Sequence, residues 1–249
     1  MLLFITTEPM GKIEHANTKC NRKKGAPMSL EITIIPLPLP LKISIVNSYL
    51  LKTETGFYLI DTGMTNARRQ LEGELERQGC RPGDLKLIVV THGDFDHTGN
   101  AVYLRGKYGS PIAMHRGDVG MLENGDMFWN RKVDNRLLRG LMKTFMPFKV
   151  VNQGKPDFFL EDEASLSEYG LDATVYNTPG HSTGSICVLT ASGELFCGDL
   201  FTSSKGKGEL NSMMYDKAEG SASLERLKQL PIQTVYPGHG KPFEWKELG

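Results

Sequence analysis

The chain has 249 residues, with 29 basic and 29 acidic side chains and a hydrophobic share of 39%. This length suits one large domain or two small ones, and the composition is too apolar for a disordered protein. The zero net charge argues against a dedicated nucleic-acid-binding protein, and no apolar run is long enough to cross a bilayer. A cytoplasmic location is expected, because the four cysteines form no Cys-x-x-Cys pair and the N-terminal stretch lacks the pattern of an export signal.

The first half of the chain predicts an alternation of strands and helices. Residues 1–28 are polar and show neither the periodicity of a helix nor that of a strand. They are therefore expected to be a disordered leader, with a strap on the surface as the alternative. Residues 29–249 are expected to form the folded domain. The hydrophobic patterns predict strands over 31–35, 42–52, 57–60, 85–90 and 111–115, and helices over 66–78 and 98–107.

The second half begins with a helical insertion over 117–148. Apolar residues recur at helical spacing from Val133 to Phe145, which favours an ordinary helix packed on the core. A mobile lid or a dimer surface is the alternative, since methionine and aromatic side chains are enriched in both. Beyond it, the patterns predict strands over 173–176, 186–190, 195–197 and 234–236, and a helix over 223–229.

Four histidines follow predicted strands and stand beside Gly, Asp or Pro. Two belong to the segment His92-Gly-Asp94-Phe-Asp96-His97, and the others are His181 in Thr-Pro-Gly-His and His239 in Tyr-Pro-Gly-His. Asp199 also follows a predicted strand. Imidazole together with carboxylate is a ligand mixture that suits Zn, Fe or Mn. A single histidine at a strand end is usually structural, but this number of them predicts a metal site.

The pattern resembles the metallo-β-lactamase-fold superfamily of metal-dependent hydrolases, which includes glyoxalase II-like and lactonase-like enzymes. Its signature is His-x-His-x-Asp-His, followed by a distant His, an Asp and a His, and the match covers roughly residues 30–243. The resemblance implies an α/β fold, an αββα four-layer sandwich of two mixed β-sheets flanked by helices. It also implies a binuclear metal site at one rim.

The same resemblance assigns the ligands. It implies that His92, His181 and the residue at 94 bind the first divalent cation, that Asp96, His97 and His239 bind the second, and that Asp199 bridges both. It further implies that a metal-bound hydroxide attacks a small ester, thioester or lactone-like substrate, with Asp96 as a catalytic ligand that orients it. Asp61-Thr-Gly resembles the Asp-containing turn that precedes the main motif in this superfamily.

Position 94 departs from the signature, because it holds Asp where the superfamily has His. Two divalent cations with four neutral imidazoles and three carboxylates leave a formal charge of +1, against +2 for the five-His set. We therefore expect weaker Lewis acidity, and Fe or Mn become competitive with Zn. Alternatively, Asp94 weakens the first position and leaves a mononuclear enzyme.

An acidic residue at 94 also resembles the flavodiiron branch. The alternatives to a hydrolase are therefore a di-iron oxidoreductase that uses a separate electron donor, and a metal-binding protein with little catalysis. RNA processing and β-lactam hydrolysis are disfavoured by the neutral charge and by the absence of an export signal. The expected partner is a small-molecule substrate, with no nucleic acid and no membrane, and a homodimer is the oligomer considered.

Substrate contacts are harder to select by pattern. The candidates are His115, at the end of a predicted strand, and three residues in the segment after Asp199, which are Lys205, Asn211 and Tyr215. Thr91, Ser182 and Thr183 are candidates for hydrogen bonds to the ligands.

Overall fold

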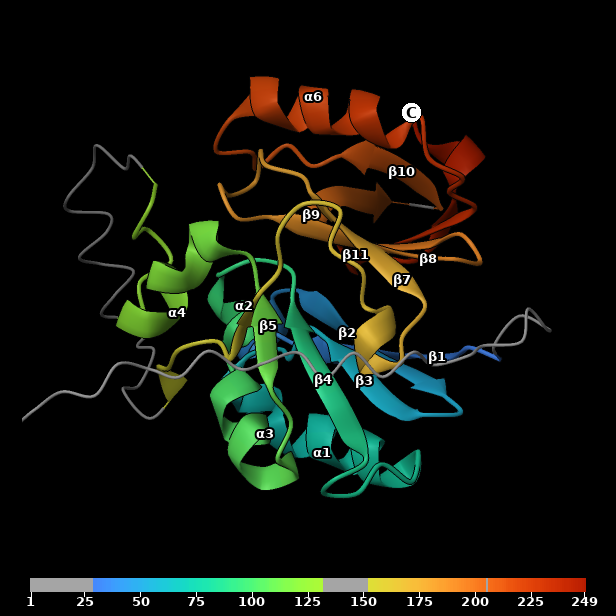
Figure 1. The fold of residues 1–249 in the computed structure, drawn as a ribbon. Helices are drawn as coiled ribbons and strands as arrows, with labels where there is room; N and C mark the ends of the chain where they lie inside the picture. Colours follow the sequence, from blue (N-terminus) through green and yellow to red (C-terminus); the bar gives the residue numbers. More distant parts are fainter. Residues whose placement is uncertain (1–28, 132–151, 205) are drawn as a thin grey trace, which may run out of the picture.

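The computed structural model describes residues 29–131, 152–204 and 206–249. The expected leader, the predicted helix from Val133 to Phe145 and Lys205 therefore lie outside the described residues. The two sheets stack face to face, with α1 and α3 covering the first sheet and α6 covering the second (Figure 1). This arrangement is the αββα sandwich that the resemblance implies.

The first sheet is a mixed, six-stranded sheet. Its order is β1-β2-β3-β4-β5-β6; the first three strands pair antiparallel and the last three join in parallel. The strands are β1 (Glu31–Pro38), β2 (Ile45–Thr53), β3 (Gly56–Ile60), β4 (Leu85–Val90), β5 (Ile112–Met114) and β6 (Phe158–Phe159). The helices between them are α1 (Arg68–Arg77), α2 (Phe95–Thr98), α3 (Ala101–Tyr108) and α4 (Val119–Asn124), with 3₁₀ turns at Pro40–Lys42, Thr65–Ala67 and Arg116–Asp118.

The second sheet is also mixed. Its order is β12-β11-β9-β8-β7, with β10 paired to β9. The strands are β7 (Ala173–Asn177), β8 (Ile186–Thr190), β9 (Glu194–Ser204), β10 (Lys207–Leu210), β11 (Thr234–His239) and β12 (Phe243–Glu244). The helix α6 (Lys217–Leu227) packs outside it, and 3₁₀ turns lie at Ser167–Tyr169 and Trp245–Glu247.

Alternation along the strands separates the core into three apolar layers. In β2, Leu50 faces α1 and α3, whereas its neighbours Tyr49 and Leu51 face the second sheet. A third cluster, which includes Leu195 and Leu227, lies between the second sheet and α6. Because the central strands are apolar on both faces, their sequences are continuous apolar runs rather than an alternation.

Most predicted elements are present, and the largest differences in bounds are those of β9 and α6. The strands over 85–90 and 186–190 have the predicted bounds. The predicted strand over 195–197 is too short: β9 continues to Ser204 because its second half pairs with β10, which the sequence pattern did not reveal. The predicted helix over 223–229 begins earlier, since the side chain of Asp216 caps the backbone amides of Ala218 and Glu219.

Within the described part of the chain, no helix has both the length and the apolar character needed to cross a bilayer.

Candidate metal centre

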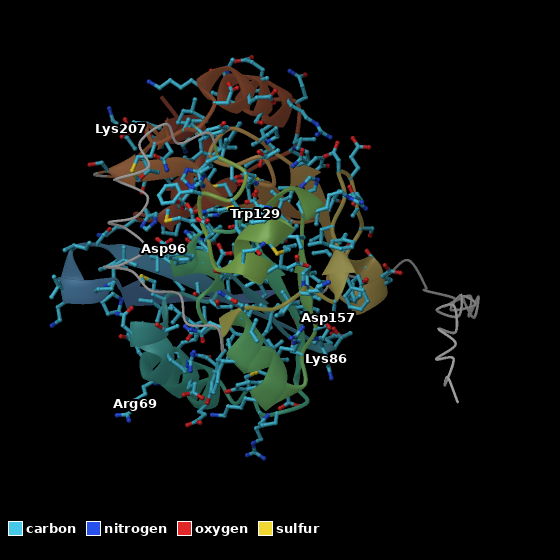
Figure 2. All side chains as sticks on the ribbon, turned by 90° about the vertical axis from the view of Figure 1, so that its left-hand side faces the viewer. Arg69, Lys86, Asp96, Trp129, Asp157 and Lys207 are labelled. Atoms are coloured by element: carbon cyan, nitrogen blue, oxygen red, sulfur yellow. The ribbon has the colours of Figure 1, made fainter. Side chains whose placement is uncertain are left out.

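The two sheets deliver the seven predicted ligands to one edge of the sandwich. The first sheet contributes the segment after β4, in which α2 carries Asp96 and His97. The second sheet contributes three residues. His181 lies in the connection between β7 and β8, Asp199 lies within β9, and His239 is the last residue of β11. Figure 2 shows Asp96 between the halves of the molecule that the two sheets form.

The seven side chains converge in three overlapping groups. His92, Asp94 and His181 form one group, and Asp96, His97 and His239 form another; in each, the potential ligand atoms lie within 4.8 Å of one another. Asp199 lies between them: its Oδ1 is 3.4 Å from His97 Nε2, and its Oδ2 is 3.8 Å from His181 Nε2 and 3.5 Å from His239 Nε2. The geometry therefore offers two adjacent positions that share one carboxylate.

Each of the four histidines is held through its Nδ1 atom. His181 Nδ1 lies 2.8 Å from the carbonyl oxygen of Met213, and His239 Nδ1 lies 2.7 Å from that of Ile45. A carbonyl oxygen only accepts, so both Nδ1 atoms donate. In the neutral ring that a cation binds, the lone pair is therefore on Nε2, which faces the cluster.

The other two rings share one buried carboxylate, that of Asp61. His97 Nδ1 lies 2.8 Å from Asp61 Oδ2. His92 Nδ1 lies 3.0 Å from the hydroxyl of Thr91, which itself donates to Asp61 Oδ2 at 2.8 Å. Because the hydroxyl proton is used on Asp61, Thr91 accepts from His92. All four Nε2 atoms thus point to the centre with the tautomer that a metal ligand requires.

Several atoms at the centre are buried but make no hydrogen bond within the described part of the chain. They include the Nε2 atoms of His92 and His97 and the Oδ1 atom of Asp199. Buried polar atoms are rarely left unsatisfied, and three of them facing one another indicate that something else binds there. Lone pairs on imidazole nitrogen and carboxylate oxygen fit a divalent cation of the Zn, Fe or Mn type.

The carboxylates and the imidazoles of the cluster stabilise each other's charged forms. Burial lowers the pKa of His97, but the carboxylates of Asp61, Asp199 and Asp96 outweigh it and hold that pKa well above the usual value. Burial raises the pKa of Asp199, yet the surrounding histidines bring it far below the usual value. The site is therefore built to hold carboxylates ionised beside positive charge, and cations that bind there displace protons from the imidazoles.

Comparison with known proteins identifies the family. The family model described as the Metallo-beta-lactamase superfamily matches residues 41–239. The chain belongs to the metallo-β-lactamase superfamily. A similar relative is the probable metallo-hydrolase MJ0888 of Methanocaldococcus jannaschii, 32% identical over 198 residues that cover 78% of this chain and 87% of that protein. The probable metallo-hydrolase YybB of Bacillus subtilis is 28% identical and covers 85% and 87% of the two chains.

Solved structures agree with this membership. A metallo-beta-lactamase family protein of Thermus thermophilus has a TM-score of 0.64 and 26% identity, over 86% of this chain and 74% of that chain. TTHA1623, solved in a di-iron-bound form, has a TM-score of 0.63 and 27% identity, over 84% and 93% of the two chains. At the level of the superfamily, the chain is a metal-dependent hydrolase.

Asp61 supports the site of this superfamily member through hydrogen bonds. It occupies a left-handed backbone conformation, with φ of 58°, in the turn after β3. Its Oδ1 accepts the backbone amide of Thr91, and its Oδ2 accepts both the Thr91 hydroxyl and the His97 ring. The sequence pointed to this turn, but not to the hydrogen bonds through which Asp61 orients His92 and His97.

We expect Asp61→Asn to lower the affinity for the cation at the His97 position by about 10- to 100-fold. The amide would place an N–H group against His97 Nδ1, so the ring would turn or change tautomer and Nε2 would lose its lone pair. Competition with a chelator of known affinity measures this change. Asp84→Asn is the matched control, because Asp84 accepts a backbone amide in an exposed turn away from the site. Equal cation affinity in both variants would contradict this role of Asp61.

Asp118 is a buried carboxylate that the sequence analysis missed. Its Oδ2 accepts the backbone amide of Gly93 at 2.9 Å and the hydroxyl of Ser182 at 2.5 Å, and its Oδ1 accepts the backbone amide of Gly184 at 2.8 Å. It therefore joins the loop of His92 and Asp94 to the loop of His181. No motif or periodicity marks it. Ser182, a candidate for contact with a ligand, binds Asp118 and Ser185 instead.

Arg131 is a second residue that the sequence analysis missed. Its Nη1 lies 2.8 Å from Asp94 Oδ1, and its Nη2 lies 3.1 Å from Asp94 Oδ2. Burial raises the pKa of Asp94, but the neighbouring rings of His181 and His92 and the charge of Arg131 together bring that pKa well below its usual value. Asp94 is therefore an ionised carboxylate that binds an arginine on one side and faces the histidines on the other.

A glycine makes the close approach of the sheets possible at this edge. A Cβ atom at Gly238 would lie 2.3 Å from Asp199 Oδ1 and 2.7 Å from the His97 ring. Any other residue before His239 would displace the shared carboxylate.

The cluster lies in the wall of a cavity of about 990 Å³. Asp94, Asp96, His181, Asp199 and His239 are part of its lining. Much of the remaining lining is apolar and includes Leu39, Leu41, Ile43, Met64, Met127, Met213 and Met214. Such a lining suits a small organic molecule, with its reacting group at the cluster and an apolar portion against the apolar side chains.

The structure separates the four predicted substrate contacts. Tyr215 and Asn211 line the cavity; Asn211 donates to the backbone carbonyl of Asp199 at 3.0 Å and so also fixes the strand that carries it. His115 does not line the cavity: its Nδ1 accepts the amide of Gly117 as the chain turns after β5, and its other nitrogen faces Glu161. Lys205 lies outside the described residues.

Proposed function

We propose that the chain is a binuclear metal-dependent hydrolase of a small ester, thioester or lactone whose acyl part is apolar. The observation that carries this proposal is the placement of the His and Asp cluster in the lining of a cavity whose remaining lining is largely apolar. A reacting carbonyl at the cluster and an acyl group against Met64 and Ile43 use both kinds of lining residue.

The proposed ligand sets follow the geometry. His92, Asp94 and His181 would hold one cation, and Asp96, His97 and His239 would hold the other. Asp199 would contact both, because its two oxygens face both groups. Divalent cations bound there would act as Lewis acids that polarise a substrate oxygen and lower the pKa of a water molecule.

Asp96 is the proposed catalytic carboxylate. Its side chain is 21% exposed, against 8% for Asp94 and 5% for Asp199, and it lines the cavity. Its Oδ2 lies 3.3 Å from His239 Nε2, so the carboxylate is fixed on one side and faces solvent on the other. A carboxylate in this position accepts a proton from an attacking water molecule and orients the water toward the substrate.

A hydrolase panel tests the proposal on protein loaded separately with Zn, Mn and Fe. We expect hydrolysis of esters, thioesters or lactones, with kcat/KM rising about fourfold for each methylene of the acyl chain until the apolar wall is covered, since each buried methylene contributes about 0.8 kcal/mol. Ile43→Ser should reduce this dependence on chain length, because Ile43 lines the cavity and is otherwise exposed.

Ile34→Ser is the matched control, since Ile34 is an exposed isoleucine that does not line the cavity. No turnover on any substrate of the panel with any of the three metals would contradict the proposal and favour a metal-binding protein with little catalysis.

A di-iron oxidoreductase with a separate electron donor is the second candidate. The oxygen donor at Asp94 favours a harder ion than an all-histidine set does, and TTHA1623, at 27% identity, was solved in a di-iron-bound form. Iron-loaded protein would then show a visible absorption band and consume oxygen or nitric oxide when a reduced flavoprotein is supplied. Hydrolysis without such consumption supports the first candidate.

A further inference from the structure

The carboxylate of Asp94 has an arginine partner. Arg131 binds both of its oxygens, and the side chains of the two residues are 10% and 8% exposed. Arg131 Nη2 also lies 3.3 Å from the backbone carbonyl of His181, so the guanidinium contacts two of the three residues of that group. Apart from histidines, Arg131 is the basic residue among the described residues that line the cavity.

We propose that Asp94 and Arg131 act as one neutral unit that replaces the histidine at this position of the superfamily signature. Arg131 thus acts on the bound cations only through the charge that it supplies beside Asp94. This inference rests on the proposed binuclear site.

Charge is the first argument for the unit. Two divalent cations with four neutral imidazoles and three carboxylates leave a formal charge of +1, and the guanidinium of Arg131 returns it to +2. That is the charge of the set with a histidine at position 94. The sequence-based expectation of a weaker Lewis acid counted Asp94 without its partner.

Geometry is the second argument. A carboxylate has about four lone-pair sites, and Arg131 uses one of them through its Nη2 hydrogen bond to Oδ2, while its Nη1 lies in an ion pair beside Oδ1. Asp94 Oδ2 still faces the histidines, 3.0 Å from His181 Nε2 and 3.6 Å from His92 Nε2. One oxygen therefore remains available as a ligand while the pair to Arg131 is kept.

If Asp94 and Arg131 act as one unit, the effect of a substitution at position 94 on the number of bound cations depends on the residue at position 131. D94H leaves the guanidinium without its carboxylate beside two cations, so one cation should be lost. In D94H/R131Q the surplus charge is gone and the site has the usual five histidines, so the second cation should return. R131Q alone makes the site more negative and should keep both cations.

The experiment counts the ions retained per chain after dialysis against a weak chelator. We expect about two for the wild type, R131Q and D94H/R131Q, and about one for D94H. D94H/R131K separates charge from packing: it keeps a cation at 131 and should behave as D94H. R226Q is the matched control, because Arg226 pairs with Asp162 away from the site, and it should retain about two.

Thermal unfolding of each metal-free variant verifies that the chains compared are folded. If D94H/R131Q does not fold, the comparison of D94H with R131Q decides whether the two residues act as a unit. The unit requires that D94H loses one cation and that R131Q retains both. Equal retention in D94H and D94H/R131Q, or loss in R131Q, would overturn the inference. A wild-type chain that retains a single ion contradicts the binuclear proposal instead, and the comparison of D94H with D94H/R131Q still decides the role of the pair.

Discussion

Replacing Asp199 with alanine is expected to lower kcat/KM by more than about 100-fold and to release at least one cation. Substitution of residues that only orient a ligand costs about 10- to 100-fold, and Asp199 is placed to contact both cations directly. The loss of activity and the loss of metal should occur together, because the same two oxygens serve both positions. Steady-state kinetics and elemental analysis of the same preparation measure the two effects.

Asp157→Ala is the control for this variant. Asp157 is a partly exposed carboxylate that pairs with Arg105 outside the cluster, so its loss should change neither the metal content nor the rate (Figure 2). Asp199→Ala should also remain folded without metal, since it removes one of several carboxylates from the centre. An active Asp199→Ala variant with a full complement of metal would remove the proposal that this residue is shared by two cations.

Replacing Asp118 with alanine is expected to lower the free energy of unfolding by about 3 kcal/mol. The variant leaves the amides of Gly93 and Gly184 without their acceptor and leaves the hydroxyl of Ser182 with Ser185 alone. A buried group without its partner costs about 1–3 kcal/mol, which water entering the space partly offsets. Urea unfolding of the metal-free chain measures the change.

Asp118→Ala should also weaken cation binding, although Asp118 contacts no proposed ligand side chain. It joins the loop of Asp94 to the loop of His181, so its loss frees two groups of ligands from one another. Asp162→Ala is the control, because Asp162 accepts a backbone amide and an arginine at a half-exposed position and should cost less than about 1 kcal/mol. The same loss of stability in both variants would contradict the role of Asp118 as the buried link.

The sequence predicts the layers well because the signals are local. The run 85–90 has apolar residues buried on both faces, with Lys86 exposed, and its bounds are those of β4. The length of β9 depends instead on its pairing with β10, and the start of α6 depends on a cap by Asp216, neither of which a hydrophobic pattern contains. Contacts between distant segments, rather than propensity, decide those boundaries.

The same distinction applies to the candidate site. The seven proposed ligands follow a spaced motif, so their convergence could be predicted before the structure was known. Arg131 and Asp118 lie within residues 116–131, which hold no motif, and they belong to the site only because they contact Asp94 and Gly93 in three dimensions. The charge of the site could not be predicted without Arg131, since a partner for Asp94 is visible only in three dimensions.

Anomalous diffraction from crystals of the metal-loaded protein would locate the cations themselves. We expect two peaks, one bounded by His92, Asp94 and His181 and the other by Asp96, His97 and His239, with Asp199 in contact with both. A single peak, or peaks away from these side chains, would contradict this expectation.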